Sequence, residues 1–281
     1  MHTFRPAVCG VFGSREGEMK RRTKKLACPI LGTMLFAVFS FHCVVGCSTF
    51  LIGGALLPGA DFVKIPGADS EVMSTEITQL QWQSIMDYQP WGWMADSSRR
   101  FPSKNMFYEG DHYPASFISH EQAMDFCVEL SRRDPVWSYR LPTAAEWMYA
   151  CGDGTNSLYC YGDDERSLDE YAWYRSNSRD PQAFHEVAQK KATRWGLYDT
   201  HGNMLEWTTT TNLDGKIECC GGSYMSKASD CALYFQRLLP PSPGYMDTGF
   251  RVFREKKTTP GSPCRKNSCV KVVNGDGYIK K

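Results

Sequence analysis

Twelve cysteines make sulfur chemistry the first function to consider for this 281-residue chain. Eight of them lie beyond residue 100, at Cys127, Cys151, Cys160, Cys219, Cys220, Cys231, Cys264 and Cys269. An even number permits disulfides in an oxidising compartment, in many alternative pairings. Neither a Cys-x2-Cys pair nor metal-ligand spacing among the histidines occurs, so we expect no structural zinc site. Ser223 lacks the Gly-x-Ser-x-Gly motif of a hydrolase nucleophile.

The amino-terminal segment predicts a lipid anchor. Basic residues within Met19–Lys25 precede Leu26–Gly46, which has no acidic or basic side chain. This run ends in Val44-Val45-Gly46-Cys47, which resembles the bacterial lipobox. Cleavage before Cys47 and lipidation of its thiol would make residues 1–46 a signal peptide and 47–60 a tether. We therefore expect a bacterial membrane-anchored lipoprotein on the outer membrane or cell surface, or on the periplasmic face; the alternative is a retained signal-anchor helix.

Composition favours a globular domain and argues against nucleic-acid binding. The chain is 42% hydrophobic and 22% charged, which excludes a disordered chain or a coiled coil. Residues 47–281 carry 25 Lys/Arg against 29 Asp/Glu, whereas a nucleic-acid-binding protein needs a basic face. Seven Lys/Arg against one acid make residues 256–281 a basic tail, in which Cys264 and Cys269 can close a small disulfide loop.

Local patterns predict few helices, short strands and long loops, an α+β arrangement. Residues 61–65 alternate with period two before Pro66-Gly67, as a strand and turn do. Residues 78–86 suit a short helix that buries Trp82 and Ile85. Capping boxes at 119–122 and 143–146 start two further helices, with apolar positions every three or four residues. After Gly152 we expect loops and short strands dense in Gly, Tyr and Trp.

Five motifs are specific to one family. They are Tyr139-Arg140-Leu141-Pro142-Thr143, Glu146-Trp147, Trp195-Gly196-Leu197-Tyr198-Asp199 with Gly202-Asn203-Met204-Leu205-Glu206-Trp207, Gly221-Gly222-Ser223-Tyr224 and Gly249-Phe250-Arg251-Val252. In this order they resemble the formylglycine-generating (sulfatase-modifying factor) domain family. The resemblance covers residues 61–255 and implies that family's variant of the C-type lectin fold.

The same resemblance implies a calcium ion. Its ligands would be the side chains of Asp199 and Glu206 and the carbonyl oxygens of Gly202 and Met204, an oxygen set that Ca²⁺ prefers. The alternative is a turn braced by Asn203, with Glu206 paired to an arginine.

Copper is not expected, because one of the family's two catalytic cysteines is missing. Active members bind Cu(I) with two thiols that follow Gly-Gly-Ser-Tyr. Here Cys231 stands at the second position and Ser226 at the first. A serine hydroxyl is a poor ligand for this soft ion. Cys219 and Cys220 would substitute only if the loop were rebuilt.

The following segment resembles another branch of lectin-fold proteins, the variable proteins diversified by diversity-generating retroelements. Their variable region displays ligand-binding residues. By position these would be Tyr234, Phe235, Arg237, Leu238, Leu239, Tyr245 and Asp247. Such residue types are common in binding hot spots; alternatively, the leucines with Pro240 and Pro241 pack the loop on the core.

We therefore expect a binding protein whose loops between Gly221 and Gly249 hold an extracellular or envelope ligand, either a protein or a glycan. Two alternatives remain open. One is a divergent formylglycine-generating oxidase that uses Cys231 with a neighbouring cysteine. The other is an accessory subunit of an envelope complex.

Overall fold

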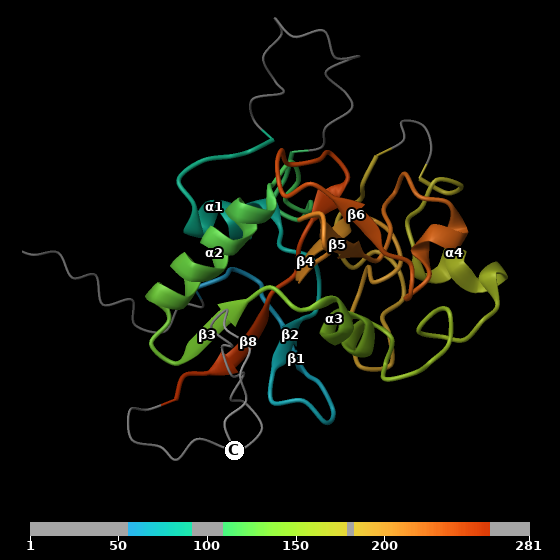
Figure 1. Ribbon diagram of the computed structural model, residues 1–281, viewed down its shortest axis with the longest axis horizontal. Helices are drawn as coiled ribbons and strands as arrows, with labels where there is room; N and C mark the ends of the chain where they lie inside the picture. Colours follow the sequence, from blue (N-terminus) through green and yellow to red (C-terminus); the bar gives the residue numbers. More distant parts are fainter. Residues whose placement is uncertain (1–55, 92–108, 179–182, 259–281) are drawn as a thin grey trace, which may run out of the picture. The chain divides into compact units, whose positions relative to one another are not determined.

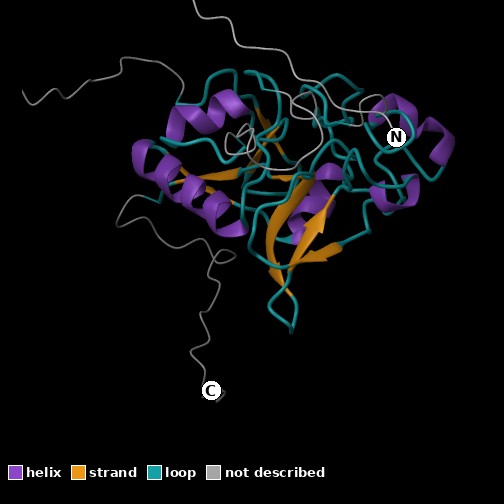
Figure 2. Cartoon of the chain, turned by 90° about the horizontal axis from the view of Figure 1, so that it is seen from above, coloured by secondary structure: helices purple, strands orange, loops and turns teal. Residues whose placement is uncertain are grey.

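The computed structural model describes residues 56–91, 109–178 and 183–258, and in them short helices and strands form an α+β fold (Figure 1). The helices are α1 (Gln79–Ile85), α2 (His120–Arg133), α3 (Ala144–Cys151) and α4 (Leu168–Tyr171). The strands are β1 (Phe62–Lys64), β2 (Glu71–Met73), β3 (Trp137–Arg140), β4 (Leu205–Thr211), β5 (Ile217–Cys220), β6 (Arg237–Leu239), β7 (Thr248–Gly249) and β8 (Phe253–Lys256). Loops make up much of the rest (Figure 2).

Three helices begin at capping residues, and the caps at Ser119 and Thr143 were predicted from the sequence. Thr78, Ser119 and Thr143 precede α1, α2 and α3, and each closes a complete capping box. In each box the side chain of the capping residue accepts from the backbone N–H of the third helical residue. The Gln or Glu side chain of that third residue accepts from the backbone N–H of the capping residue. The apolar positions expected on each helix are buried.

Two four-stranded sheets organise the domain. The first has the order β1-β2-β8-β3 and is antiparallel throughout. The second has the order β6-β5-β4-β7, and β7 runs parallel to β4. In Figure 1, α2 lies beside α1 and against β3.

Aromatic packing fills the space between the helices and the second sheet. Trp82 stacks on Phe126 with ring centroids 5.4 Å apart, and Phe250 meets both rings edge-on. The same cluster contains Trp207 of β4. A second cluster packs Trp147 of α3 against the other side of the sheet. These clusters hold β4 and β5, from which the candidate site extends.

The end of the predicted tether belongs to the folded domain, which corrects the boundary at residue 60. Leu57 is only 3% exposed and packs in the main cluster, because moving an apolar side chain out of water lowers the free energy of the folded state. The predicted signal peptide, Cys47 and nearly all of the basic tail lie outside the described residues. Within the described part of the chain, no helix has the length and apolarity needed to cross a bilayer.

Candidate functional site

Two glycines let the turn at Gly221–Ser226 pass directly over Cys231. Gly221 and Gly222 have φ values of 93° and 72°. A Cβ on Gly222 would lie 2.9 Å from the Cys231 Sγ and 2.7 Å from the Asp230 carbonyl oxygen. Glycine fits there without displacing the backbone. The turn is therefore packed tightly on the 3₁₀ turn at Ala228–Cys231.

Ser226 and its neighbours form a chain of polar contacts. The Ser226 Oγ accepts from the Ser223 N–H at 2.9 Å. The Ser223 Oγ donates to the Asp247 Oδ2 at 3.0 Å, and the Arg237 Nη1 donates to the same oxygen at 2.9 Å. The hydroxyl at the first cysteine position thus stabilises the turn, and the Ser223 hydroxyl connects the turn through Asp247 to the exposed Arg237.

The donor set at the copper position does not fit Cu(I). Burial raises the pKa of the Cys231 thiol to about 12, so this thiol stays protonated near neutral pH. Cys219 and Cys220 point to opposite faces of β5, and burial raises the pKa of both. Because Cu(I) sites use deprotonated or soft sulfur donors, we derive no copper-dependent step. The cysteines in the described residues are all free, and Cys127 of α2 and Cys151 of α3 are buried.

The predicted ligand-binding residues differ in exposure. Tyr234 and Leu238 are 49% and 43% exposed, and Arg237 is exposed as well. Phe235 and Tyr245 are half-buried.

Two residues of this set are not displayed, which corrects the prediction for them. Leu239 is 6% exposed and packs in the main core, as the alternative interpretation required. Asp247 is 5% exposed, and its carboxylate holds Ser223 and Arg237 instead of facing solvent.

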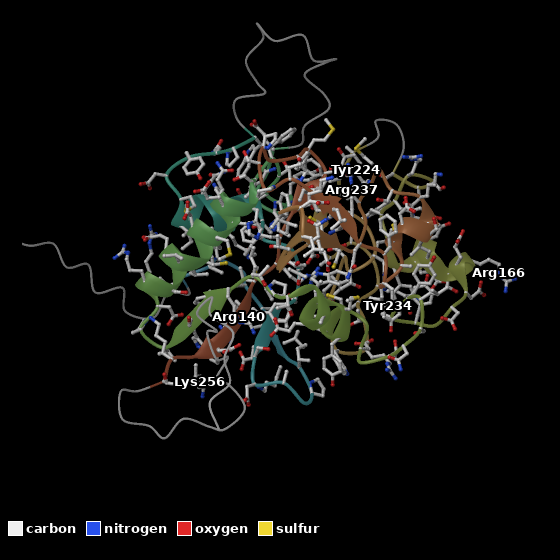
Figure 3. The ribbon with its side chains drawn as sticks, viewed as in Figure 1. Arg140, Arg166, Tyr224, Tyr234, Arg237 and Lys256 are labelled. Carbon is white, nitrogen blue, oxygen red and sulfur yellow. The ribbon has the colours of Figure 1, made fainter. Side chains whose placement is uncertain are left out.

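The exposed residues do not form one patch. Arg237 and Leu238 are adjacent in β6 and therefore point to opposite faces. The Tyr234 hydroxyl donates to the Thr155 carbonyl oxygen beyond α3. Figure 3 shows Arg237 beside Tyr224, with Tyr234 well apart from both. Among these residues, Arg237 is connected to the Ser223–Ser226 turn, through Asp247.

The segment of the expected calcium ligands is a buried turn. Asp199, Gly202 and Asn203 have positive φ values of 57°, 116° and 58°. The Asn203 Nδ2 donates to the Glu76 Oε1 at 3.2 Å, and its Oδ1 accepts from the His185 N–H at 2.9 Å. Asn203 therefore braces the turn from two sides.

Glu206, one of the expected calcium ligands, is engaged by other groups. Its Oε1 accepts from the Arg251 Nη2 at 2.6 Å, and its Oε2 accepts from the Trp147 Nε1 at 2.6 Å. Both side chains of the ion pair are fully buried. Glu206 thus pairs with an arginine, the role that the alternative interpretation gave it.

Glu76, which no motif indicated, supplies a carboxylate beside Asp199. The Glu76 Oε2 and the Asp199 Oδ1 are buried without a hydrogen-bond partner. Burial raises the pKa of both groups, and the carboxylates of Asp199 and Glu206 raise the pKa of Glu76 further. Carboxylate oxygens with unused lone pairs are ligands for a hard cation. Asp199 and Glu76 are thus the two carboxylates with an unpartnered oxygen at this turn, whereas both oxygens of Glu206 are engaged by Arg251 and Trp147.

A family model and two characterised proteins match this chain. The model of the sulfatase-modifying factor enzyme 1-like domain matches residues 53–256. The chaperone protein LppX of Paenibacillus barcinonensis is 25% identical over 230 residues, which cover 67% of this chain and 81% of that protein. The formylglycine-generating enzyme of Mycobacterium tuberculosis is 31% identical over 194 residues, 62% of this chain. The match spans 61% of that enzyme's length.

Solved structures share the fold. Treponema denticola variable protein 1 aligns with a TM-score of 0.55 at 23% identity, over 69% of this chain and 91% of that one. PvdO from Pseudomonas aeruginosa aligns with a TM-score of 0.54 at 16% identity, over 70% and 91%. CarF aligns with a TM-score of 0.51 at 24% identity, over 66% and 86%. At these identities the likeness establishes the fold alone.

Proposed function

Because the chain belongs to the sulfatase-modifying factor enzyme 1-like domain family, we propose that it is a non-catalytic binding protein whose loops between Gly221 and Gly249 hold the ligand. The observation that carries this proposal is the serine at position 226. Its hydroxyl is committed to the Ser223–Asp247–Arg237 chain of contacts, while the thiol at 231 is buried and protonated. A scaffold without its oxidising thiol pair retains a surface for recognition.

The first prediction is that this protein does not convert cysteine to formylglycine. The purified domain is incubated with Cu(I), oxygen and a peptide containing Cys-x-Pro-x-Arg, and the peptide is analysed by mass spectrometry. We expect an unmodified cysteine, because a hydroxyl and a buried thiol cannot form a two-sulfur copper site. A formylglycine-generating enzyme serves as the positive control. Turnover by this protein that disappears in Cys231→Ala would instead establish the oxidase alternative.

A protein is the ligand class that the relatives favour. The relative LppX is a chaperone by name, and chaperones act on proteins. This likeness supports a protein ligand over a glycan and keeps the accessory-subunit role as a second candidate. Purification of the native protein under mild conditions separates the two roles: envelope partners at stoichiometric amounts favour the accessory subunit.

We also propose that Cys47 carries the lipid that anchors the protein at the bacterial envelope. Metabolic labelling with an alkyne fatty acid should label the wild type and not Cys47→Ser. The side of the membrane on which the domain lies is then tested by adding protease to intact cells and measuring whether the protein is cleaved. Diversification of the 223–252 segment is a separate proposal, and a reverse transcriptase gene with a near-copy of this coding segment close by would support it.

The second prediction concerns calcium, which we propose is held by Asp199 and Glu76 with the carbonyl oxygens of Gly202 and Met204. A bound divalent cation would neutralise two buried carboxylates, so calcium should raise the melting temperature and a chelator should lower it. Glu76→Gln should remove the response to calcium. In chelator the same variant should be at least as stable as the wild type, because it buries one charge fewer.

Asp214→Asn is the matched control for this prediction, because Asp214 is an exposed acid on the β4–β5 turn. This variant should respond to calcium like the wild type. An equal melting temperature of the wild type with calcium and with chelator would contradict the proposed site.

A further inference from the structure

Three exposed cationic side chains border the Ser223–Ser226 turn. The Arg175 Nε donates to the Met225 carbonyl oxygen at 2.9 Å, and its N–H donates to the Ser226 carbonyl oxygen at 3.0 Å. Lys227 is the next residue along the chain. Arg237 reaches the turn from β6 through Asp247, which also accepts from Ser223. Cations from three separate segments therefore surround one turn.

This local positive charge contrasts with the rest of the domain. Residues 47–255 contain 18 Lys/Arg and 28 Asp/Glu, so the domain as a whole is strongly acidic. At the turn, the buried carboxylate of Asp247 offsets one cation, and Asp230 is the nearest other acid along the chain. Asp247 thus pairs with Arg237, one of the three cations that border the turn.

The cations are set among apolar side chains. Met225 lies in the turn itself, and Tyr245 lies two residues before Asp247; both side chains are half-buried. Guanidinium groups present several N–H donors in a plane and match the two oxygens of a carboxylate. A surface of this kind suits a ligand that alternates carboxylates with apolar groups.

We infer that the ligand is a short acidic peptide segment of a partner protein, bound across Arg175, Lys227 and Arg237. This inference rests on the proposed function and specifies its ligand class. Long polyanions such as nucleic acids, and anionic membranes, extend beyond the turn and meet the acidic remainder of the domain, which repels them. A short segment contacts the cations alone.

Fluorescently labelled domain is applied to two arrays of otherwise identical short peptides, one with glutamate and one with lysine at the fixed positions. We expect binding to glutamate peptides and its loss at high salt. Arg175→Ala and Arg237→Ala should each weaken binding about tenfold, the loss of one charge-assisted hydrogen bond. Arg175→Lys and Arg237→Lys should retain part of the binding to glutamate peptides, since the positive charge remains. Arg166→Ala is the control, because Arg166 is exposed and far from Arg237 (Figure 3).

The outcomes separate this inference from the proposed function. Glutamate-dependent binding that Arg175→Ala and Arg237→Ala weaken, and Arg166→Ala does not, supports the acidic ligand. Binding that ignores glutamate but is lost in Tyr245→Ala overturns the ligand class and leaves the binding surface in place. Binding that Arg166→Ala weakens equally, or an absence of binding to either array, overturns the inference. If Arg166→Ala weakens binding equally, the attraction is non-specific. If neither array binds the domain, these cations only stabilise the turn.

Discussion

Replacing Arg251 with methionine should lower the free energy of unfolding by about 3–5 kcal/mol, the usual cost of breaking a buried ion pair. The Arg251 guanidinium forms hydrogen bonds with both Glu206 oxygens and with the Tyr198 carbonyl oxygen. Both side chains are fully buried. The variant leaves the Glu206 carboxylate in the core with the Trp147 N–H as its remaining partner. Urea unfolding followed by tryptophan fluorescence measures the difference.

A double variant distinguishes a lost ion pair from lost packing. Arg251→Met combined with Glu206→Gln removes both charges, so it should be more stable than Arg251→Met alone. Arg166→Met is the control for an exposed pair, and its stability should equal that of the wild type within error. If Arg251→Met unfolded at the same urea concentration as the wild type, the pair would not hold the sheet in place.

Gly202→Ala should destabilise the domain by about 2–5 kcal/mol, the sum of backbone strain and a steric clash. Gly202 has a φ of 116°, a region that residues with a Cβ seldom adopt. A Cβ there would lie 2.2 Å from the Trp173 carbonyl oxygen. That oxygen also accepts the Asn203 N–H at 2.7 Å, so it cannot move away without losing this bond. Thermal unfolding measures the effect.

Gly215→Ala is a matched control for this clash. Gly215 has a φ of 75°, but nothing lies within 4 Å of a Cβ built on it. The substitution should cost about 1 kcal/mol from backbone conformation alone. Equal losses in the two variants would mean that strain, rather than the approach of Trp173, makes glycine necessary at position 202.

The ion pair and the glycine turn connect the scaffold to the proposed functions. Glu206 lies in the buried first half of β4, and β4 pairs with β5 and β7. β5 leads into the Gly221–Ser226 turn, while β7 follows the loop that carries Tyr245 and Asp247. A loss of either feature should therefore disturb ligand binding as well as stability, although neither residue touches the proposed ligand.

Local sequence alone predicted helices α1, α2 and α3 and identified the family. Capping boxes at Ser119 and Thr143 need only a few neighbouring residues, so their helices follow from the sequence. The motif order likewise identified the domain, and Ser226 revealed the missing thiol, because both depend on residue type at a given position. These features require no knowledge of distant contacts.

Tertiary structure alone decided which side chains meet. Leu239 lies in the core and Leu238 at the surface because strand pairing sets the face of each residue, which residue type does not reveal. Glu76 meets Asp199, and Arg175 meets Met225, across separations of 123 and 50 residues. The partner of a carboxylate or a guanidinium depends on how distant segments pack. The choice of Glu76 as a proposed calcium ligand and the proposed acidic-peptide surface therefore follow from the fold, while Asp199, the family and the absent thiol follow from the sequence.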